Sequence, residues 1–472
     1  MTIHSEWARV FYNECPDAFV AELKKSTLRD MNVGVIDGHL QLMCLNEKMI
    51  TWQRFLQYMF LNPIEQMFNM GCKTVVLCFD AYDFVPLYKN MTQLKRTQGK
   101  TVCTFEPHHD LPPKIPDDPM RFLMNRSFKL KLIQMICDRI PQLVKIKEHQ
   151  EFIIDYKKVT LYQQSSQASS VLIPVHLPEY ESMGESDVKF TRYVEKYGNA
   201  LVHAIDGDYM IIALLYYAKR GILKNNKIFI YRQIQKDCSP CITSAAEAAG
   251  NSKKRSIDHV VDDFSSFEKP RHLHKKNKCW IDMQLIYVTM LEAFRQALRT
   301  DSAAMDIDQQ HCDKEEDYIQ CVVFTILCAG TDFSRQLPLI GPQRLWEHLP
   351  LYAEYLMEGL KQKQDAMILA TFSKIYKTIF SKHVRCSTSA WSLVRDNLMS
   401  SSLAQSTKNK FPTEQQLVVT MRNILWVMSY WSTVNNSVET PVDGSNGYVL
   451  CPHTRKVQFM DSSPLATPPL PY

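Results

Sequence analysis

Two acidic doublets, each close to an apolar stretch, are the residues of this sequence best suited to chemistry. They are Glu185-Ser-Asp187 and Asp206-Gly-Asp208. The second doublet lies between the apolar segments 200–205 and 209–215, so its carboxylates interrupt what reads as a buried strand running into a buried helix. Burying two carboxylates without compensation costs roughly several kcal/mol, and a bound cation removes that cost. The doublets therefore predict a divalent-metal site.

Three short apolar segments are predicted strands, and an aspartate follows each of them. The segments are 32–36, 74–79 and 200–205, followed by Asp37, Asp80 and Asp206. Ligands bind at the carboxyl ends of parallel strands, so we expect the three aspartates to meet in one crevice. For any one of them, the cap of a following helix is an equally good interpretation. Helical periodicity at 52–70 completes a βα alternation.

The expected fold is therefore α/β, with a central, mostly parallel twisted sheet flanked by helices and a C-terminal helical region. A chain of 472 residues with 45% apolar content has room for two or three packed units. The net charge of +5 suits a polyanion-binding enzyme and an ordinary globular protein equally well. Fourteen cysteines without a compact framework, after a start that does not resemble a signal peptide, indicate free thiols in a reducing compartment. The apolar runs are too short to span a bilayer.

Composition divides the chain into six segments. We expect 1–96 and 171–232 to form the two parts of one α/β domain, 97–170 a variable loop and arch-like helical segment, 233–317 a polar, partly disordered insertion with a helix at 280–298, 318–400 a helix-turn-helix region, and 401–472 a helix and a proline-rich tail. The insertion contains Lys253-Lys-Arg255, which fits a nuclear import signal or a solvated charge run equally well. Its Cys238-Ser-Pro-Cys241, taken with His272, His274 and Cys279, resembles a zinc-ligand set, but the spacing of the whole set matches no common zinc module.

Taken together with Gly330-Thr-Asp332 and Ile340-Gly-Pro342, the acidic positions resemble those of the flap endonuclease (XPG-like) family of structure-specific 5′ nucleases. The order of the acids matches, and so does the step of nineteen residues from Asp187 to Asp206. The resemblance covers about residues 30–96, 171–217 and 318–350. It implies the fold of the PIN-like nuclease superfamily, with a helix-turn-helix region towards the C-terminus.

The resemblance implies two Mg²⁺ ions, which Mn²⁺ can replace, held by seven carboxylates. The implied ligands are Asp37, Asp80, Glu185, Asp187, Asp206, Asp208 and Asp332. Of these, we expect Asp80, Glu185, Asp187 and Asp206 to lie nearest the metals and the others to act partly through water. An all-carboxylate set suits Mg²⁺, which prefers oxygen ligands.

The resemblance also assigns basic residues to the substrate. Lys89 and Arg96, seven residues apart on one face of a predicted helix, match the pair that faces the scissile phosphate, with Lys95 as a competing candidate. Ile340, Gly341 and Arg344 would bind a duplex phosphate at a helix N-terminus, with a K⁺ ion; the alternative is a plain turn before a helix.

Three positions depart from the family pattern. Asp187 stands where the family has glutamate, Met43 where it has a tyrosine near the reacting nucleotide, and Leu339 where it prefers glycine. Metal geometry and substrate preference are expected to differ accordingly.

The implied activity is hydrolysis of flapped, nicked or branched DNA, in endonuclease and exonuclease modes, during replication, repair or recombination. The expected partner is DNA with a 5′ flap, nick or junction, and the protein is expected to be a monomer. Its expected location is the nucleus or the site where a virus or parasite replicates its DNA. No sliding-clamp motif is evident near the C-terminus. The alternatives are a 5′→3′ exoribonuclease, because 203–208 also resembles that branch, and a catalytically weak DNA-binding homologue.

Overall fold

The structure is a computed structural model. It describes residues 3–45, 51–81, 103–106, 108–164, 172–180, 185–204, 206–219, 226–234, 277–301, 311–330, 336–387, 390–432, 448–450 and 457–459.

A mixed sheet of nine described strands forms the centre of the α/β part, in the order β1-β9-β8-β7-β2-β3-β4-β5-β6. Its middle strands β8, β7, β2, β3 and β4 are parallel, and antiparallel strands extend both edges. The strands are β1 (Phe19–Val20), β2 (Val33–Asp37), β3 (Thr74–Cys78), β4 (Glu151–Asp155), β5 (Val159–Gln164), β6 (Leu172–His176), β7 (Ala200–His203), β8 (Ile228–Ile234) and β9 (Asn277–Asp282).

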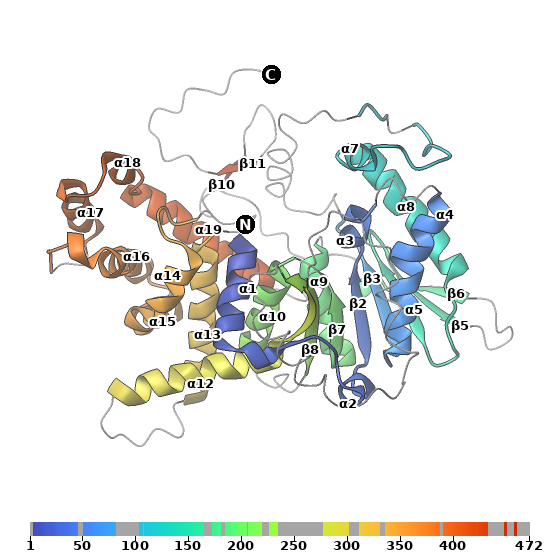
Figure 1. The fold of residues 1–472 in the computed structure, drawn as a ribbon, viewed down its shortest axis with the longest axis horizontal. Helices are drawn as coiled ribbons and strands as arrows, with labels where there is room; N and C mark the ends of the chain where they lie inside the picture. Colours follow the sequence, from blue (N-terminus) through green and yellow to red (C-terminus); the bar gives the residue numbers. More distant parts are fainter. Residues whose placement is uncertain are drawn as a thin grey trace, which may run out of the picture.

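Both faces of the parallel strands are covered by helices, as continuous apolar strands require. All residues of β2 and β3 are buried. On one face lie α9 (Ser186–Tyr197) and α10 (Asp208–Lys219). On the other lie α4 (Trp52–Leu56), the π-helical turn η2 (Gln57–Leu61), α5 (Asn62–Asn69) and α8 (Arg126–Leu143), as Figure 1 shows. The shorter helices α2 (Lys25–Arg29), α3 (Gly38–Met43) and α7 (Pro119–Leu123) lie between these elements in the chain.

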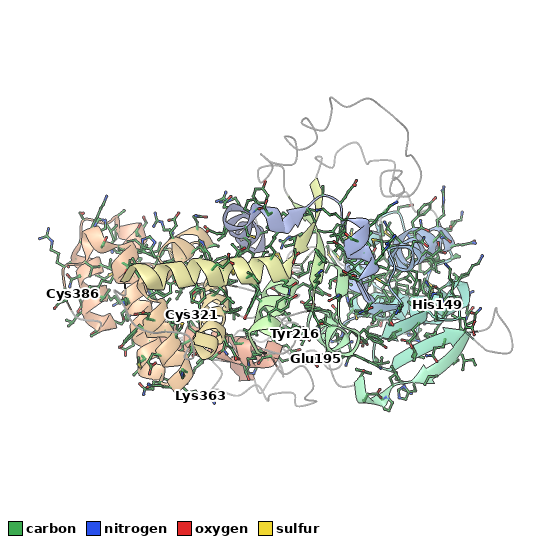
Figure 2. The ribbon with its side chains drawn as sticks, turned by 90° about the horizontal axis from the view of Figure 1, so that it is seen from below. His149, Glu195, Tyr216, Cys321, Lys363 and Cys386 are labelled. Atoms are coloured by element: carbon green, nitrogen blue, oxygen red, sulfur yellow. The ribbon has the colours of Figure 1, made fainter. Side chains whose placement is uncertain are left out.

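A second, all-helical part lies to one side of the sheet (Figure 1). Helix α10 connects the two parts, since it packs against α9 as well as against α13 and α19. In Figure 2 its residue Tyr216 accordingly lies between Cys321 of the helical part and His149 of the α/β part. The helices of this part are α1 (Ile3–Glu14), α12 (Met283–Asp301), α13 (His311–Cys328), α14 (Pro342–Glu347), α15 (Ala353–Gln362), α16 (Asp365–Ile379), α17 (Trp391–Ser400), α18 (Gln405–Lys408) and α19 (Glu414–Ser432). A small hairpin, β10 (Tyr448–Leu450) and β11 (Val457–Phe459), follows.

The α/β prediction is confirmed, and the three predicted strands form as β2, β3 and β7 within two residues of their expected ends. Two segments differ from the prediction. The segment expected as loop and helix, 97–170, contributes β4 and β5 to the sheet, and the predicted insertion contributes β9 as well as α12. The cause is the same in both cases, because periodicity alone does not distinguish a short apolar run in a strand from a turn of buried helix.

Two further observations concern membrane-spanning helices and the state of the cysteines. Within the described ranges, no helix is long and apolar enough to cross a membrane. The cysteines described there are free thiols.

Candidate metal centre

The sheet brings the strand-end aspartates together at one edge. Asp37 is the last residue of β2, and Asp80 follows β3 by two residues; both are buried. In-register pairing of Asp37 with Cys78 and of Ile36 with His203 makes β2, β3 and β7 end at the same level. Asp206, three residues beyond β7, is exposed, and it lies close enough to Asp37 for its charge to raise the pKa of the Asp37 carboxyl. The three aspartates therefore lie at the same edge of the sheet, as the order of the strands predicts.

Helix α9 delivers the first doublet to the same edge. Glu185 precedes the helix and is fully buried, and Asp187 lies in its first turn. Between them, Ser186 donates its backbone N–H to Asp80 Oδ1 at 2.9 Å. The Ser186 hydroxyl lies 2.9 Å from Asp80 Oδ1 and 3.2 Å from Asp187 Oδ1, so its single proton is shared between two carboxylates. Asp80 is thus fixed by the beginning of α9.

The second doublet joins the first through the start of α10. Asp208, the first residue of α10, is buried, and its N–H lies 3.4 Å from Asp206 Oδ1. Asp187, Asp206 and Asp208 each offer one oxygen, and these oxygens all lie within 4.8 Å of one another. Oxygens this close from three carboxylates can hold a metal ion.

The electrostatics of Asp37 reflect this crowding. Burial raises the pKa of its carboxyl well above the ordinary value, and the charges of Asp187, Asp80 and Asp206 raise it further. The hydrogen bond from the Leu40 N–H lowers the pKa of Asp37 and so opposes this rise. Asp37 Oδ1 also accepts from the N–H groups of His39 and Leu40 and so caps α3. The alternative interpretation as a helix cap is therefore correct for Asp37, which caps a helix and belongs to the acidic cluster at once.

Two histidines of the site were not predicted from the sequence. His39 Nδ1 accepts the Asp80 N–H at 3.3 Å and lies 3.8 Å from Asp80 Oδ2. His203, near the end of β7, is hydrogen-bonded to Gln41 at 2.9 Å. In the sequence, these histidines are marked only by their positions: His39 lies two residues after Asp37, and His203 lies three residues before Asp206.

A buried ion cluster, also unpredicted, adjoins the acids on α9. Asp155, at the end of β4, is paired with Lys189 Nζ at 2.8 Å and with Arg192, and it accepts a hydrogen bond from the Tyr193 hydroxyl at 2.8 Å. All four side chains are buried. Burial pushes the pKa of Asp155 upward, but Arg192 and Lys189 outweigh it and hold that pKa below the ordinary value.

The donor set fits a hard divalent cation. Besides the paired Asp155, six described carboxylates approach this edge of the sheet. The group whose ligand atoms lie within 4.8 Å of one another, Asp187, Asp206 and Asp208, consists of carboxylates alone. Oxygen ligands of this kind suit Mg²⁺ and Mn²⁺. The mutual repulsion that raises the pKa of Asp37 is the interaction that such a cation relieves.

The structure does not describe four of the predicted site residues, and it places three others in the helical part. Lys89, Lys95, Arg96 and Asp332 lie outside the described residues. In the helical part, Gly341 caps α14 and has open space where a Cβ would project, and Arg344 on that helix is exposed. Ile340 is buried in the core, so only its backbone is available to a ligand. Leu339 has φ +69°, in the left-handed region that favours glycine, which is the residue that the flap endonuclease pattern prefers at this position.

A scan against protein-family models gives no match for the chain, and a search of curated proteins gives none either.

Proposed function

We propose that this protein is a divalent-metal-dependent 5′ nuclease of the flap endonuclease type, which hydrolyses phosphodiester bonds in flapped, nicked or branched DNA. The observation that carries the proposal is the convergence of both acidic doublets with Asp37 and Asp80 at one edge of a parallel sheet. Metal-assisted phosphoryl chemistry uses such carboxylate sets. The order and spacing of the same acids in the sequence support the family.

The carboxylates would divide into two roles. Asp187, Asp206 and Asp208, whose oxygens lie within 4.8 Å of one another, would hold a metal directly, together with Asp80 and Glu185. Asp37 and Asp332 would act partly through water. When bound, Mg²⁺ supplies an activated water and stabilises the charge that develops on the phosphate and the leaving oxygen. The remaining work falls to the chain itself. Ser186 orients Asp80, and the start of α10 holds Asp208 beside Asp206.

Substrate contacts would come from basic groups and from one helix start. Lys89 and Arg96, or Lys95, would face the scissile phosphate. The backbone around Gly341, with Arg344 and a K⁺ ion, would hold a duplex phosphate away from the reacting bond. The open space over Gly341 and the exposure of Arg344 support this assignment.

The test is cleavage of a 5′-flap DNA in Mg²⁺ by purified Asp80→Ala and Asp206→Ala proteins. Each variant should lose more than about 100-fold in rate, beyond the loss typical of changes around metal ligands, while DNA binding in EDTA stays within about twofold. Asp396→Ala, which removes an exposed carboxylate on α17, is the matched control and should cleave normally. Cleavage retained by either site variant would refute the proposal.

A substrate panel separates the nuclease classes. Flap, nick, bubble and single-strand DNA are compared with a matched RNA flap at equal enzyme concentration. Faster cleavage of the DNA flap supports the proposal, and faster degradation of the RNA strand from its 5′ end would replace it with the exoribonuclease alternative. Wild-type protein that binds the flap without cutting any substrate would be a DNA-binding homologue.

A further inference from the structure

We propose that Lys189 is a positioning residue of the metal centre: its buried ammonium holds the peptide between Phe79 and Asp80 and thereby orients the Asp80 carboxylate. The inference rests on the metal-binding part of the proposed function and adds a residue that the acidic pattern does not contain.

The ammonium of Lys189 is fully committed to oxygens. Its side chain has no exposed surface, and Nζ donates to the Phe79 carbonyl at 2.8 Å. The same Nζ is paired with Asp155 Oδ1 at 2.8 Å and lies 3.5 Å from the Asp155 carbonyl. An ammonium has three donors, and three oxygens surround it here. The Phe79 carbonyl is thus one of its principal partners.

The peptide that Lys189 holds is fixed on its other side as well. The carbonyl of Phe79 and the N–H of Asp80 belong to the same planar unit. That N–H donates to His39 Nδ1 at 3.3 Å, and the Phe79 N–H donates to the Asp155 carbonyl at 2.8 Å. Rotation of this unit would turn the Asp80 side chain away from the other acids. Lys189 and His39 oppose that rotation from opposite ends.

Helix α9 holds Asp80 twice from one face. Ser186 and Lys189 are three residues apart, so they lie one above the other on the helix. Ser186 binds the Asp80 carboxylate, and Lys189 binds the carbonyl that precedes Asp80. Because Asp187 lies on the same helix, this double attachment also sets the position of Asp80 relative to Asp187.

The ion cluster contains more positive charge than Asp155 needs. Arg192 and the Tyr193 hydroxyl already bind Asp155 Oδ2, so Arg192 alone would neutralise this carboxylate. Lys189 adds a second buried cation, and a buried charge is costly unless its interactions compensate for it. A methionine would fill nearly the same volume without that cost. Methionine would lose the pair with Asp155, whose charge Arg192 still neutralises, and it would lose the hydrogen bond to the Phe79 carbonyl, which Arg192 does not make.

The test compares Lys189→Met with Arg192→Met, which are matched in charge. Each removes one cation and leaves Asp155 paired with the other. Mn²⁺ binding to each protein without DNA is measured by isothermal titration and by electron paramagnetic resonance. We expect Lys189→Met to bind Mn²⁺ at least about tenfold more weakly than the wild type, the loss typical of residues that orient metal ligands. Arg192→Met should bind it as the wild type does or more tightly.

The sign of the effect distinguishes positioning from charge. Removing a cation near a group of carboxylates, by electrostatics alone, strengthens Mn²⁺ binding in both variants. Weaker binding in Lys189→Met only therefore supports positioning, and equal or tighter binding in that variant overturns it. Unfolding in urea with EDTA identifies loss of folding. If either methionine variant does not fold, Lys189→Gln and Arg192→Gln replace the pair, with the same expected order.

The outcomes also separate this inference from the nuclease proposal. If the wild type cleaves DNA and Lys189→Met binds Mn²⁺ normally, the proposed nuclease function stands and the proposed role of Lys189 is wrong. If the wild type binds Mn²⁺ but cleaves no substrate, and Lys189→Met binds Mn²⁺ more weakly, the proposed nuclease function is wrong and the proposed role of Lys189 stands. A wild type that binds no Mn²⁺ overturns both.

Discussion

Asp37 and Asp155 are buried aspartates in equivalent places, yet their environments are opposite. Asp37 ends β2 and Asp155 ends β4, and each is in register with Cys78 of the strand between them. Burial together with Asp187 and Asp80 raises the pKa of Asp37, whereas Arg192 and Lys189 overcome burial and lower the pKa of Asp155. Position in the fold therefore does not determine what a buried carboxylate does.

The neighbours of each aspartate make the difference. Around Asp155, cations and a tyrosine hydroxyl complete a compensated cluster that needs no ligand. Around Asp37, further carboxylates accumulate negative charge, which a bound cation or a proton would offset. One sheet edge thus contains a charge-compensated acid and, on the other side of β3, an acid of the cluster for which we propose a function. Four substitutions test this distinction.

The largest effect is expected from Asp155→Ala. Removing this carboxylate leaves Lys189 and Arg192 as buried cations without their partner, which typically costs about 3–5 kcal/mol. Urea unfolding in EDTA measures the loss. Added Mg²⁺ should not restore the stability, because Asp155 is not a proposed ligand. A loss below about 1 kcal/mol would show that the cluster is not the structural counterpart of the centre.

Asp37→Asn is expected to act in the opposite direction. Asparagine remains a good helix cap, so the hydrogen bonds to α3 are kept while one repelling charge is removed. The free energy of unfolding without metal should rise by about 1 kcal/mol, the size typical of a stabilising substitution. The further stabilisation by Mg²⁺ should shrink. Lower stability in EDTA would contradict the assignment of Asp37 as a functional acid.

The pH dependence of these two effects sharpens the contrast. A raised pKa means that deprotonation of Asp37 opposes folding, so the wild type gains stability as the pH falls through that pKa. The advantage of Asp37→Asn should therefore decrease with falling pH and vanish below about pH 4, where the unfolded chain is protonated too. A constant advantage from pH 8 to pH 4 would argue against a raised pKa.

Asp155 should follow the opposite course. Because its pKa is lowered, its contribution is complete above about pH 4 and is lost only as the pH falls through the lowered value. The penalty of Asp155→Asn should stay constant from pH 8 to pH 5, where the effect of Asp37→Asn is already changing. Urea midpoints at each pH, taken relative to the wild type in EDTA, measure both differences.

The same two aspartates show how far the sequence predicts this site. Asp37, Asp80 and Asp206 follow apolar strands, and the parallel order of those strands was enough to bring them together. Asp155 follows the apolar residues 152–154 in the same way, but its strand was assigned to a helical segment. Had β4 been recognised, the pattern would have added Asp155 to the metal ligands, which its environment contradicts.

That environment is not visible in local sequence. Arg192 lies 37 residues from Asp155 along the chain, on helix α9, which packs against β2, β3 and β7. The pairing depends on which face of α9 is turned towards Asp155. From the sequence alone, the basic residues of this helix look like ordinary solvent-exposed residues. The sequence pattern therefore predicted the acids, whereas tertiary contacts were needed to separate the charge-compensated Asp155 from the acids of the proposed metal centre.

Ser186→Ala should give the smallest effect, because Ser186 gives the acids a neutral partner where Asp155 has cations. The substitution removes the hydroxyl shared by Asp80 and Asp187 but keeps the backbone N–H bond to Asp80. Losing one such hydrogen bond, worth about 1 kcal/mol, should weaken Mn²⁺ binding about fivefold. Thr191→Val is the matched control. The buried hydroxyl of Thr191, also on α9, donates to the Val188 carbonyl, and its loss should leave Mn²⁺ binding unchanged. Equal effects of the two would mean that α9 acts on the centre through its stability alone, and the hydroxyl would have no part in orienting the acids.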